Sequence, residues 1–201
     1  MKYIRGKNLT LKDKKSIHIS KTAVIGNNVT IYENNRIEGN TVIKDNCILY
    51  PNNYIVDSVI EKGCSIGPFA RLRPNSSIGE NAKIGNFVEI KNSSIGKNTK
   101  ISHLAYVGDA QIGDNCNVGC GAIFVNYNGK TKSKTIVKNN CFIGSNCNII
   151  APVVIEKNSY ICAGTTLTKN TQNDDFVIGR TRETFKNNLA HKYLKTFEGD
   201  E

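Results

Sequence analysis

The sequence predicts an all-β fold, a parallel β-helix in which three short strands per coil wind around a triangular core. Aliphatic residues recur at every sixth position through most of the chain. This spacing matches neither the 3.6-residue period of a helix nor the simple alternation of an isolated strand. Glycine and asparagine, which adopt tight or left-handed corners at least cost, occupy many positions between the aliphatic residues.

The aliphatic positions form runs separated by steps of five residues and by one long interruption. Each of these side chains is expected to point at the axis from the middle of one face. Three faces give roughly 18 residues per coil, so the repeat from residue 19 to about residue 170 predicts about eight coils. The runs begin at Ile19, Ile60, Ile95, Ile112 and Val137.

The cysteines follow the same repeat. The position two residues before each aliphatic residue faces the crowded interior and should be small. Five of the 7 cysteines occupy it, and Cys120 and Cys162 lie off this register. A free cysteine packs as a small hydrophobe, and no pair has zinc-knuckle spacing, so structural thiols are favoured over a metal or redox role. The five in register are Cys47, Cys64, Cys116, Cys141 and Cys147.

Length, charge and hydropathy narrow the class of protein further. The 201 residues are enough for one domain with a core. The net charge of +10 is spread along the chain rather than gathered into a stripe, so small phosphorylated ligands are favoured over nucleic acid, with solvated turn lysines as the plain alternative. No run is long enough to span a membrane and the N-terminus has no apolar signal segment, so a cytoplasmic protein is expected.

Three segments are expected. Residues 1–18 form an N-terminal cap, residues 19–180 form the prism, and residues 181–201 form a C-terminal tail. The tail reads RETFKNNLAHKYLKTF, which predicts a short helix with Phe185, Leu189 and Leu194 near one side. Residues 125–136 are polar, break the repeat and must loop out from the prism. Interruptions of a solenoid are where function is expected.

His103 precedes this loop and is one of only 3 histidines. It is either a solvated turn residue or a base, since an imidazole suits deprotonation of an ammonium nucleophile near neutral pH. Each neighbouring polar residue either binds a hydroxylated ligand or is an ordinary surface group. These neighbours are Tyr106, Asn117, Asn126 and Tyr127.

The segment 66–169 carries more specific motifs: GPFARLRP, GNFVEIKNSSIG, SHLAYVGDAQIGDNCNVG, NYNGKTKSKT, FIGSNCNIIAPVVI and ICAGTTLT. It resembles the acetyltransferase domain of the bifunctional N-acetylglucosamine-1-phosphate uridyltransferase/glucosamine-1-phosphate acetyltransferase family, which are hexapeptide-repeat transferases. The resemblance implies a left-handed helix and acetyl transfer from acetyl-CoA to glucosamine 1-phosphate, a step of UDP-GlcNAc biosynthesis. It also implies a homotrimer whose active sites lie between neighbouring prisms.

The resemblance also implies the roles of individual residues. His103 is the expected general base, and Arg73 and Lys91 are expected to hold the sugar phosphate. The rest of the substrate pocket is expected to comprise Tyr106, Asn117, Asn126, Tyr127 and Lys132. The expected coenzyme A groove comprises Cys120, Ser145, Ala163 and Arg180.

The chain departs from the family pattern in several places. Residues 1–18 are too short for a uridyltransferase domain, so a separate uridyltransferase is a candidate partner, and no metal is expected. Asn128 replaces the usual Asp of the loop and Cys120 replaces an Ala. Glu89 is expected to pair with Lys91, to orient His103 or to be solvated.

Two rival functions stay open. One is acetylation of another amino sugar, and the other is a non-catalytic trimeric scaffold. A carbonic-anhydrase-like metal site is disfavoured because it needs three histidines.

Overall fold

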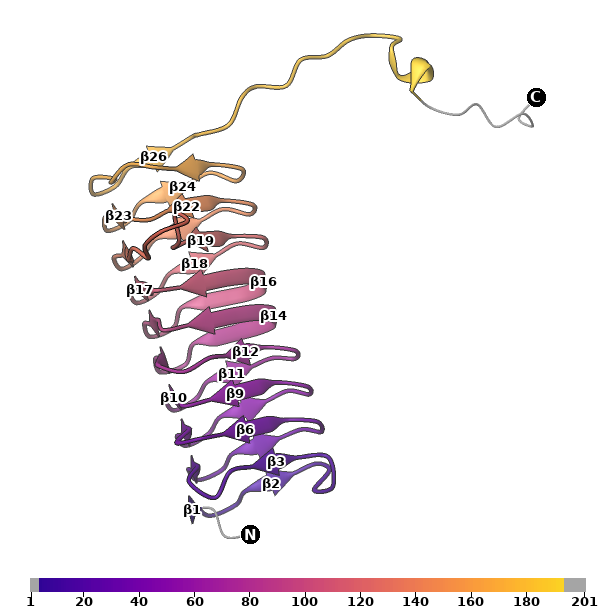
Figure 1. Cartoon of the computed structure of the whole chain (residues 1–201), viewed down its shortest axis with the longest axis vertical. Coiled ribbons are helices and arrows are strands. Elements are labelled where there is room, and N and C mark those ends of the chain that lie inside the picture. Colours follow the sequence, from indigo (N-terminus) through magenta and orange to yellow (C-terminus); the bar gives the residue numbers. More distant parts are fainter. Residues whose placement is uncertain (1–3, 194–201) are drawn as a thin grey trace, which may run out of the picture.

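A computed structural model describes residues 4–193. The chain winds as a tall prism of parallel strands, with the N-terminus at one end and an extended C-terminal segment leaving the other (Figure 1). Every pairing between its strands is parallel and joins one coil to the next. The expected all-β, left-handed parallel β-helix is confirmed.

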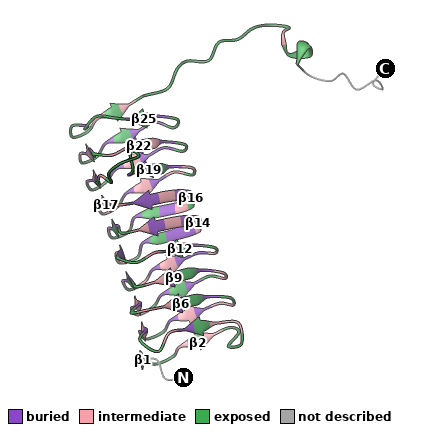
Figure 2. Ribbon diagram, viewed as in Figure 1, coloured by how far each residue is buried: buried purple, intermediate pink, exposed green. Residues whose placement is uncertain are grey.

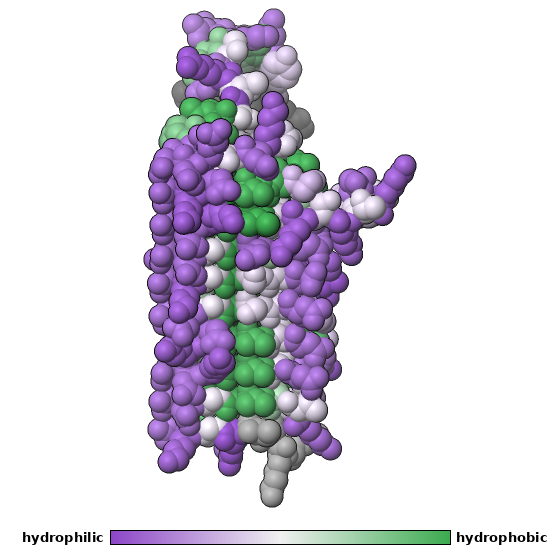
Figure 3. All heavy atoms as spheres, turned by 90° about the vertical axis from the view of Figure 1, so that its left-hand side faces the viewer, coloured by the Kyte–Doolittle hydropathy of each residue, from purple (hydrophilic) through white to green (hydrophobic). Residues whose placement is uncertain are grey.

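Face A of the prism is a sheet of nine strands. They are β1 (Ile4–Arg5), β4 (Val24–Ile25), β7 (Val42–Ile43), β10 (Ser58–Ile60), β13 (Ser76–Ile78), β15 (Ser94–Ile95), β17 (Ala110–Ile112), β20 (Thr135–Val137) and β23 (Val153–Ile155). Seen from the side of this face, apolar groups gather in two stretches along the prism (Figure 3). Its outward-facing apolar residues are Val24, Val42 and Val59 near the N-terminal end, and Ile136 and Val154 further along.

Face B follows each strand of face A. It contains β2 (Thr10–Leu11), β5 (Thr30–Ile31), β8 (Ile48–Leu49), β11 (Ser65–Ile66), the first part of β14 (Lys83–Lys91), the first part of β16 (Lys100–Gly108), β18 (Asn117–Val118), β21 (Phe142–Ile143), β24 (Tyr160–Ile161) and β26 (Phe176–Val177).

Face C completes each coil. It contains β3 (His18–Ile19), β6 (Arg36–Glu38), β9 (Tyr54–Val56), β12 (Arg71–Leu72), the second parts of β14 and β16, β19 (Ile123–Val125), β22 (Asn148–Ile150) and β25 (Thr166–Leu167). We name the corners by the faces they join: corner AB, corner BC and corner CA.

The core is the column of inward residues that the hexad pattern predicts. All the aliphatic positions of the repeat are buried, as the alternation of buried and exposed residues shows (Figure 2). Phe124 is a further core residue, and it continues the six-residue spacing one step beyond Val118. The run of core positions predicted from the sequence ended at Val118 because only aliphatic side chains were counted. The five cysteines in register are buried, as predicted, and Cys162 is buried as well.

The prism has about nine coils rather than eight. Residues ahead of Ile19 already wind around the axis: Ile4 pairs with Val24, and Thr10 pairs with Thr30. Residues 4–18 therefore form a further coil, although their spacing departs from the hexad rule. Residues 1–3 of the expected cap lie outside the described residues.

Asparagine ladders hold corner AB together. The side-chain amide of Asn28 donates a hydrogen bond to Asn46 at 3.1 Å, and that of Asn98 donates to Asn115 at 3.1 Å. All four have a positive φ, which asparagine tolerates better than other side chains. The asparagine-rich composition is thus explained by corners stacked one above another.

The C-terminal tail differs from the expected helix. After β26 the chain runs away from the prism, and the only helical turn among the described residues is the 3₁₀ turn η1 (Ala190–Lys192). Phe185 is 84% exposed, so no surface formed by residues 4–193 covers the apolar side of the expected helix. Leu194 lies outside the described residues. Within residues 4–193, no helix is long and apolar enough to cross a membrane.

Candidate functional site

The residues expected to act on the coenzyme lie on one corner of the prism. His103, Cys120, Ser145 and Ala163 occupy successive coils of corner BC, because each coil places one residue there. The backbone contacts of the following residues fix this stacking: Gly121 N–H donates to Leu104, Asn146 N–H to Cys120 and Gly164 N–H to Ser145, each at 2.7–2.8 Å. Residues 60 positions apart therefore share one edge.

Arg180 lies at the end of this column. Its Nη1 donates to the carbonyl oxygen of Ala163 at 2.9 Å, and the side chain is exposed. One nitrogen of the guanidinium is thus held by the corner, while its remaining N–H groups are available to a ligand.

His103 sits where β16 turns corner BC. Its imidazole is exposed, and its Nδ1 lies 2.6 Å from Oδ1 of Asn86 on the preceding coil. The side chains of Asn86 and His103 both border an open cavity of about 320 Å³, which is also lined by Tyr50, Pro68 and Lys83. The sequence analysis missed Asn86.

The corner turn at His103 has an unusual backbone. Phe87 and Leu104 follow Asn86 and His103, and their φ values are 56° and 41°. A left-handed conformation is strained for large side chains and is found mostly where function requires it. Phe87 and Leu104 adopt the left-handed conformation that each corner turn requires. The preceding residues, Asn86 and His103, therefore do not need it and can direct their side chains outward.

A cluster of cations occupies corner CA. Arg73, Lys91 and Lys132 line an open cavity of about 420 Å³, which Asn75, Asn92 and Asp109 complete. Arg73 Nη1 lies 3.0 Å from Oε1 of Glu89, and Lys91 Nζ lies 3.3 Å from Oδ2 of Asp109. Three cations around one lining carboxylate leave the cavity positively charged, which suits a phosphate group.

Glu89 therefore pairs with Arg73. Of the three expectations for this residue, pairing with Lys91 and orienting His103 are wrong, because Asp109 binds the Lys91 ammonium and Asn86 binds the imidazole. Glu89 pairs with Arg71 in the strand register. Its carboxylate therefore lies within reach of Arg73, which follows Arg71 by two residues.

Asp109 organises corner CA and was also missed by the sequence analysis. Oδ1 accepts a hydrogen bond from Asn92 at 2.7 Å, and Oδ2 accepts hydrogen bonds from Lys91 and Asn126. Burial by itself raises the pKa of Asp109, but the hydrogen bonds from Asn92, Asn126 and Lys91 outweigh it and hold the pKa below its ordinary value. The carboxylate stays charged and fixes Lys91.

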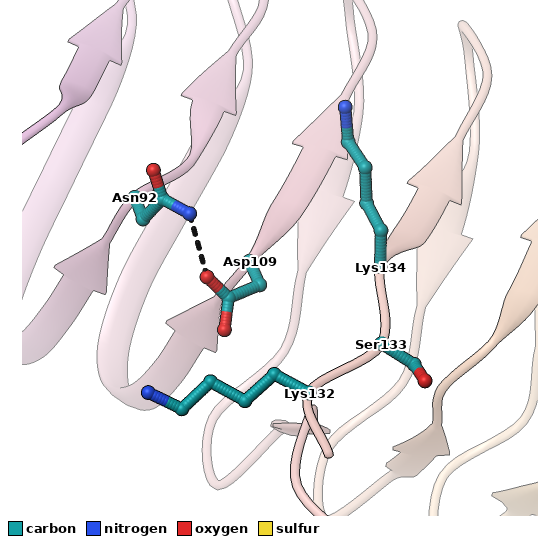
Figure 4. A pocket seen from close by; sticks show the side chains of 5 residues that line it. All are labelled: Asn92, Asp109, Lys132, Ser133 and Lys134. Carbon is teal, nitrogen blue, oxygen red and sulfur yellow. Dashed lines mark hydrogen bonds between the residues drawn. The ribbon is translucent and has the colours of Figure 1, made fainter.

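The loop after β19 brings two lysines to this corner. Lys132 extends toward Asn92 and Asp109, whereas Lys134 extends from the same segment in another direction (Figure 4). Tyr127 and Lys132 form an antiparallel bridge within the loop, and the Tyr127 hydroxyl donates to Gly129 at 2.7 Å. Tyr127 is 54% exposed.

Asn128 shapes this loop. Its Oδ1 accepts the backbone N–H groups of Lys130 and Thr131 at 2.9 and 2.8 Å. A carboxylate oxygen at this position would accept the same two bonds. The departure from the usual Asp is therefore compatible with the loop's geometry.

Face C connects the two corners. Tyr106 lies on it, and a Cβ at Gly108 would come within 2.4 Å of the Tyr106 hydroxyl and 2.8 Å of Asn126 Nδ2. The absence of a side chain at Gly108 lets these two polar groups approach one another. An open cavity of about 320 Å³ continues from Tyr106 to corner BC and is lined by Phe87, Glu89, Leu104 and Ile123.

Asn117 stands apart from this surface. It lies on β18 of face B, where it pairs with Lys100 and Phe142. One chain thus joins Arg73, Lys91, Tyr106, Asn126 and Lys132 around corner CA, but it does not bring Asn117 to them. Among the described residues, no group of three or more His, Cys, Asp or Glu side chains is placed to hold a metal ion.

Two family models match the chain. Residues 53–126 match the GMPPB C-terminal domain, and residues 134–169 match the bacterial transferase hexapeptide (six repeats). The chain is also similar to the protein described as bifunctional protein GlmU in two clostridia. It is 48% identical to that of Clostridium novyi over 93% of this chain and 45% of the relative, and 42% identical to that of Clostridioides difficile over 92% and 44%.

Solved structures share the fold. The UDP-N-acetylglucosamine acyltransferase of Arabidopsis aligns with a TM-score of 0.60 at 18% identity, over 85% of this chain and 65% of that chain. The corresponding enzyme of Bacteroides fragilis aligns with a TM-score of 0.59 at 21% identity, over 84% and 64%. A GDP-perosamine N-acetyltransferase from Caulobacter crescentus, solved with CoA and GDP-perosamine, aligns with a TM-score of 0.50 at 23% identity over 55% and 50%.

The coils and the corner column are those of a hexapeptide-repeat fold, and residues 134–169 carry the bacterial transferase hexapeptide itself. The chain is similar to the bifunctional protein GlmU along nearly all of its own length, in agreement with the resemblance seen in the sequence. It spans less than half the length of the GlmU relatives described above.

Proposed function

We propose that the chain transfers the acetyl group of acetyl-CoA to the amine of glucosamine 1-phosphate, forming N-acetylglucosamine 1-phosphate for UDP-GlcNAc biosynthesis. The observation that carries the proposal is that His103 at corner BC and the Arg73–Lys91–Lys132 cluster at corner CA stand at the two edges of face C of one prism. From His103 to Gly108 the face is five residues wide, about 16 Å. A phosphorylated hexosamine and the side chains reaching toward it from both corners fill such a span.

Corner CA would bind the phosphate. Arg73 and Lys91 are already held by carboxylates, and Lys132 comes from the loop. Charge-assisted hydrogen bonds to phosphate are stronger than neutral ones. Tyr106 and Asn126 would bind sugar hydroxyls or the reacting amide, and Tyr127 would cover the site from the loop.

Corner BC would carry out the proton transfer. The amine nitrogen attacks the thioester carbon, and the imidazole of His103 takes the proton that the nitrogen loses. The C–S bond then breaks, and the imidazolium returns that proton to the departing sulfur, so that the coenzyme leaves as its thiol. The backbone N–H groups of the corner or the hydroxyl of Ser145 would stabilise the oxyanion. Asn117 would come from a second copy of the chain, in a homotrimer with active sites between neighbouring prisms.

The same corner would hold acetyl-CoA. The coils are packed closely here: a Cβ at Gly119 would come within 2.6 Å of Ser145 N, and one at Gly144 within 2.4 Å of Ala163 N. The corner is thus a narrow edge beside which an extended ligand can lie, with Cys120, Ser145 and Ala163 exposed along it. Arg180 at its end has free N–H groups for a phosphate of the coenzyme.

A thiol-release assay tests the proposal. The chain is mixed with acetyl-CoA and glucosamine 1-phosphate, and the free thiol is followed. We expect release that falls at least about a hundredfold in His103→Ala, because a general base contributes about 10²–10⁴-fold. His18→Ala, at an exposed histidine on face C, is the matched control and should keep full activity.

The same assay separates the alternatives. Glucosamine without its phosphate should react poorly, and Lys91→Ala should raise the KM for the phosphorylated sugar. Faster release with a different amino sugar would favour that substrate. Thiol release no greater in the wild type than in His103→Ala would contradict an enzymatic role and leave a trimeric scaffold.

A further inference from the structure

Asn86 is the side chain that holds His103. It lies on β14 directly opposite His103 in the parallel register of β14 and β16. Its Oδ1 is 2.6 Å from Nδ1 of the imidazole. The two corner turns are packed closely, since a Cβ on Gly85 would lie 1.9 Å from the carbonyl oxygen of Ser102. The backbone therefore fixes the distance between the two side chains.

The chemistry of this pair determines the tautomer. An amide oxygen only accepts hydrogen bonds, so the Nδ1 that faces it must carry the hydrogen. In the neutral ring the lone pair then resides on Nε2, the nitrogen that points away from Asn86. A base that is to take a proton from a ligand needs its lone pair on that free nitrogen.

Resting on the function proposed above, we propose that Asn86 is a positioning residue that fixes His103 as the Nδ1–H tautomer, with Nε2 presented to the acceptor amine. It is not a catalytic residue, because it reaches the substrate only through the imidazole. The arrangement follows the general rule that a partner on one ring nitrogen orients and sets the tautomer of the other.

Asn86 is an uncharged partner for the imidazole of His103. A carboxylate at the same place would also accept the Nδ1 hydrogen, but its charge would stabilise the imidazolium. The nearby Glu89 is bound by Arg73 and does not contact the ring. The charged group that borders the His103 cavity is Lys83 on β14. The next coil of corner BC carries Cys120 at the position that matches His103. Asn86 thus orients the ring without adding negative charge.

Nitrogen-15 NMR of the histidine side chains tests the tautomer without substrate. The chain has only 3 histidines, and His103→Gln identifies the signals of His103. Above the titration range, the wild type should show Nδ1 protonated and Nε2 unprotonated. Asn86→Leu, which has similar bulk and no acceptor, should shift these signals toward the other tautomer or a mixture.

This measurement can overturn the proposal whatever the chain acetylates. A wild-type His103 with its hydrogen on Nε2, or signals unchanged in Asn86→Leu, would refute the positioning role. Circular dichroism shows whether Asn86→Leu folds, and Asn86→Ser, which is smaller and retains an oxygen acceptor, provides a second variant.

Kinetics give the functional side of the test. Loss of an orienting partner typically costs about 10–100-fold, so Asn86→Leu should lower kcat by that factor and leave the KM for glucosamine 1-phosphate within about twofold. Asn86→Asp should retain more activity than Asn86→Leu, and the acid limb of its kcat/KM profile should move to higher pH. Asn40→Leu, at an exposed corner asparagine far along the prism, is the control and should match the wild type.

The two failures are distinguishable. If no sugar supports thiol release, the proposed function fails and NMR still decides the role of Asn86. If release is normal in Asn86→Leu, or if the acid limb does not move in Asn86→Asp, the proposed function stands and the positioning role is refuted.

Discussion

At the scale of single residues, the charged side chains of corner CA depend on Asp109. Its carboxylate accepts hydrogen bonds from Lys91 and Asn92 on the preceding coil and from Asn126 on the following coil. Lys91 alone is too flexible to be held in one place, because a lysine side chain loses considerable rotamer freedom when fixed. Asp109 thus prepares the lysine for an anion.

The lowered pKa of Asp109 predicts how its contribution to stability varies with pH. Because the folded pKa lies below the unfolded value of about 3.9, the ionised group stabilises the fold above that value, and the contribution is lost as pH falls through the folded pKa. We expect the Tm difference between wild type and Asp109→Asn to be largest near pH 7 and to shrink below about pH 4. Thermal unfolding at matched concentrations measures it, and a difference that grows on acidification would contradict the assignment.

The roles predicted for His103, Arg73 and Lys91 come from motifs, and they stay predictions. The structure places all three residues at corners of the prism. Asn86 and Asp109 were missed because asparagine and aspartate at corners are usually explained by backbone conformation. On the Asn86 coil, however, Phe87 takes the left-handed position. The sequence carries a signal for this difference, because large apolar residues stand at positions 69, 87 and 104, where other coils have asparagine or glycine.

At the scale of elements, buried amide side chains join successive coils in addition to the strand pairings. Asn53 is 2% exposed; its Nδ2 donates to Asn35 Oδ1 at 2.9 Å, and its Oδ1 accepts the N–H of Ala70 at 2.8 Å. It therefore links three successive coils at corner BC, on the N-terminal side of the site.

Asn53→Ala should destabilise the chain by about 1–3 kcal/mol, because the buried N–H of Ala70 and the carbonyl group of Asn35 lose their partner. Denaturant unfolding measures this change in the free energy of unfolding. The exposed Asn40→Ala serves as the comparison and should change it by less than about 0.5 kcal/mol. Equal effects of the two substitutions would show that the interior amides are not structural links.

Elements were predictable where packing within the chain decides them. The hexad positions are buried throughout because each coil covers the next. The helix predicted for the tail is not formed, because apolar spacing favours a helix only if a surface covers its apolar side. Within the described part of the chain, Phe185 stays exposed. Residues 4–11 were underestimated for the converse reason: their strands lack the regular spacing but still pair with β4 and β5.

At the scale of the whole molecule, a triangular prism separates residues that one reaction would need. Tyr106 and Lys91 belong to face C and corner CA, whereas Asn117 belongs to face B. The two faces point in different directions, so the proposed site would need a second copy of the chain to bring Asn117 to the other residues. This is the structural argument for the proposed homotrimer.

Mixing two inactive variants tests this argument. Lys91→Ala and Asn117→Ala are each expected to have little activity. The two variants are unfolded and refolded together in equal amounts. A site with both residues intact then forms wherever one variant contributes Lys91 and its neighbour contributes Asn117. In randomly assembled closed trimers this gives about a quarter of wild-type activity. The variants refolded separately and then combined are the control. No recovery after joint refolding, with mixed oligomers verified, would place the whole site within one chain.

The central claim is that the imidazole of corner BC and the cations of corner CA act on one ligand. A crystal structure of the chain with glucosamine 1-phosphate tests it most directly. We predict the phosphate among Arg73, Lys91 and Lys132, with the amine directed toward Nε2 of His103. A sugar phosphate bound elsewhere, or bound at corner CA with its amine turned away from His103, would contradict the account.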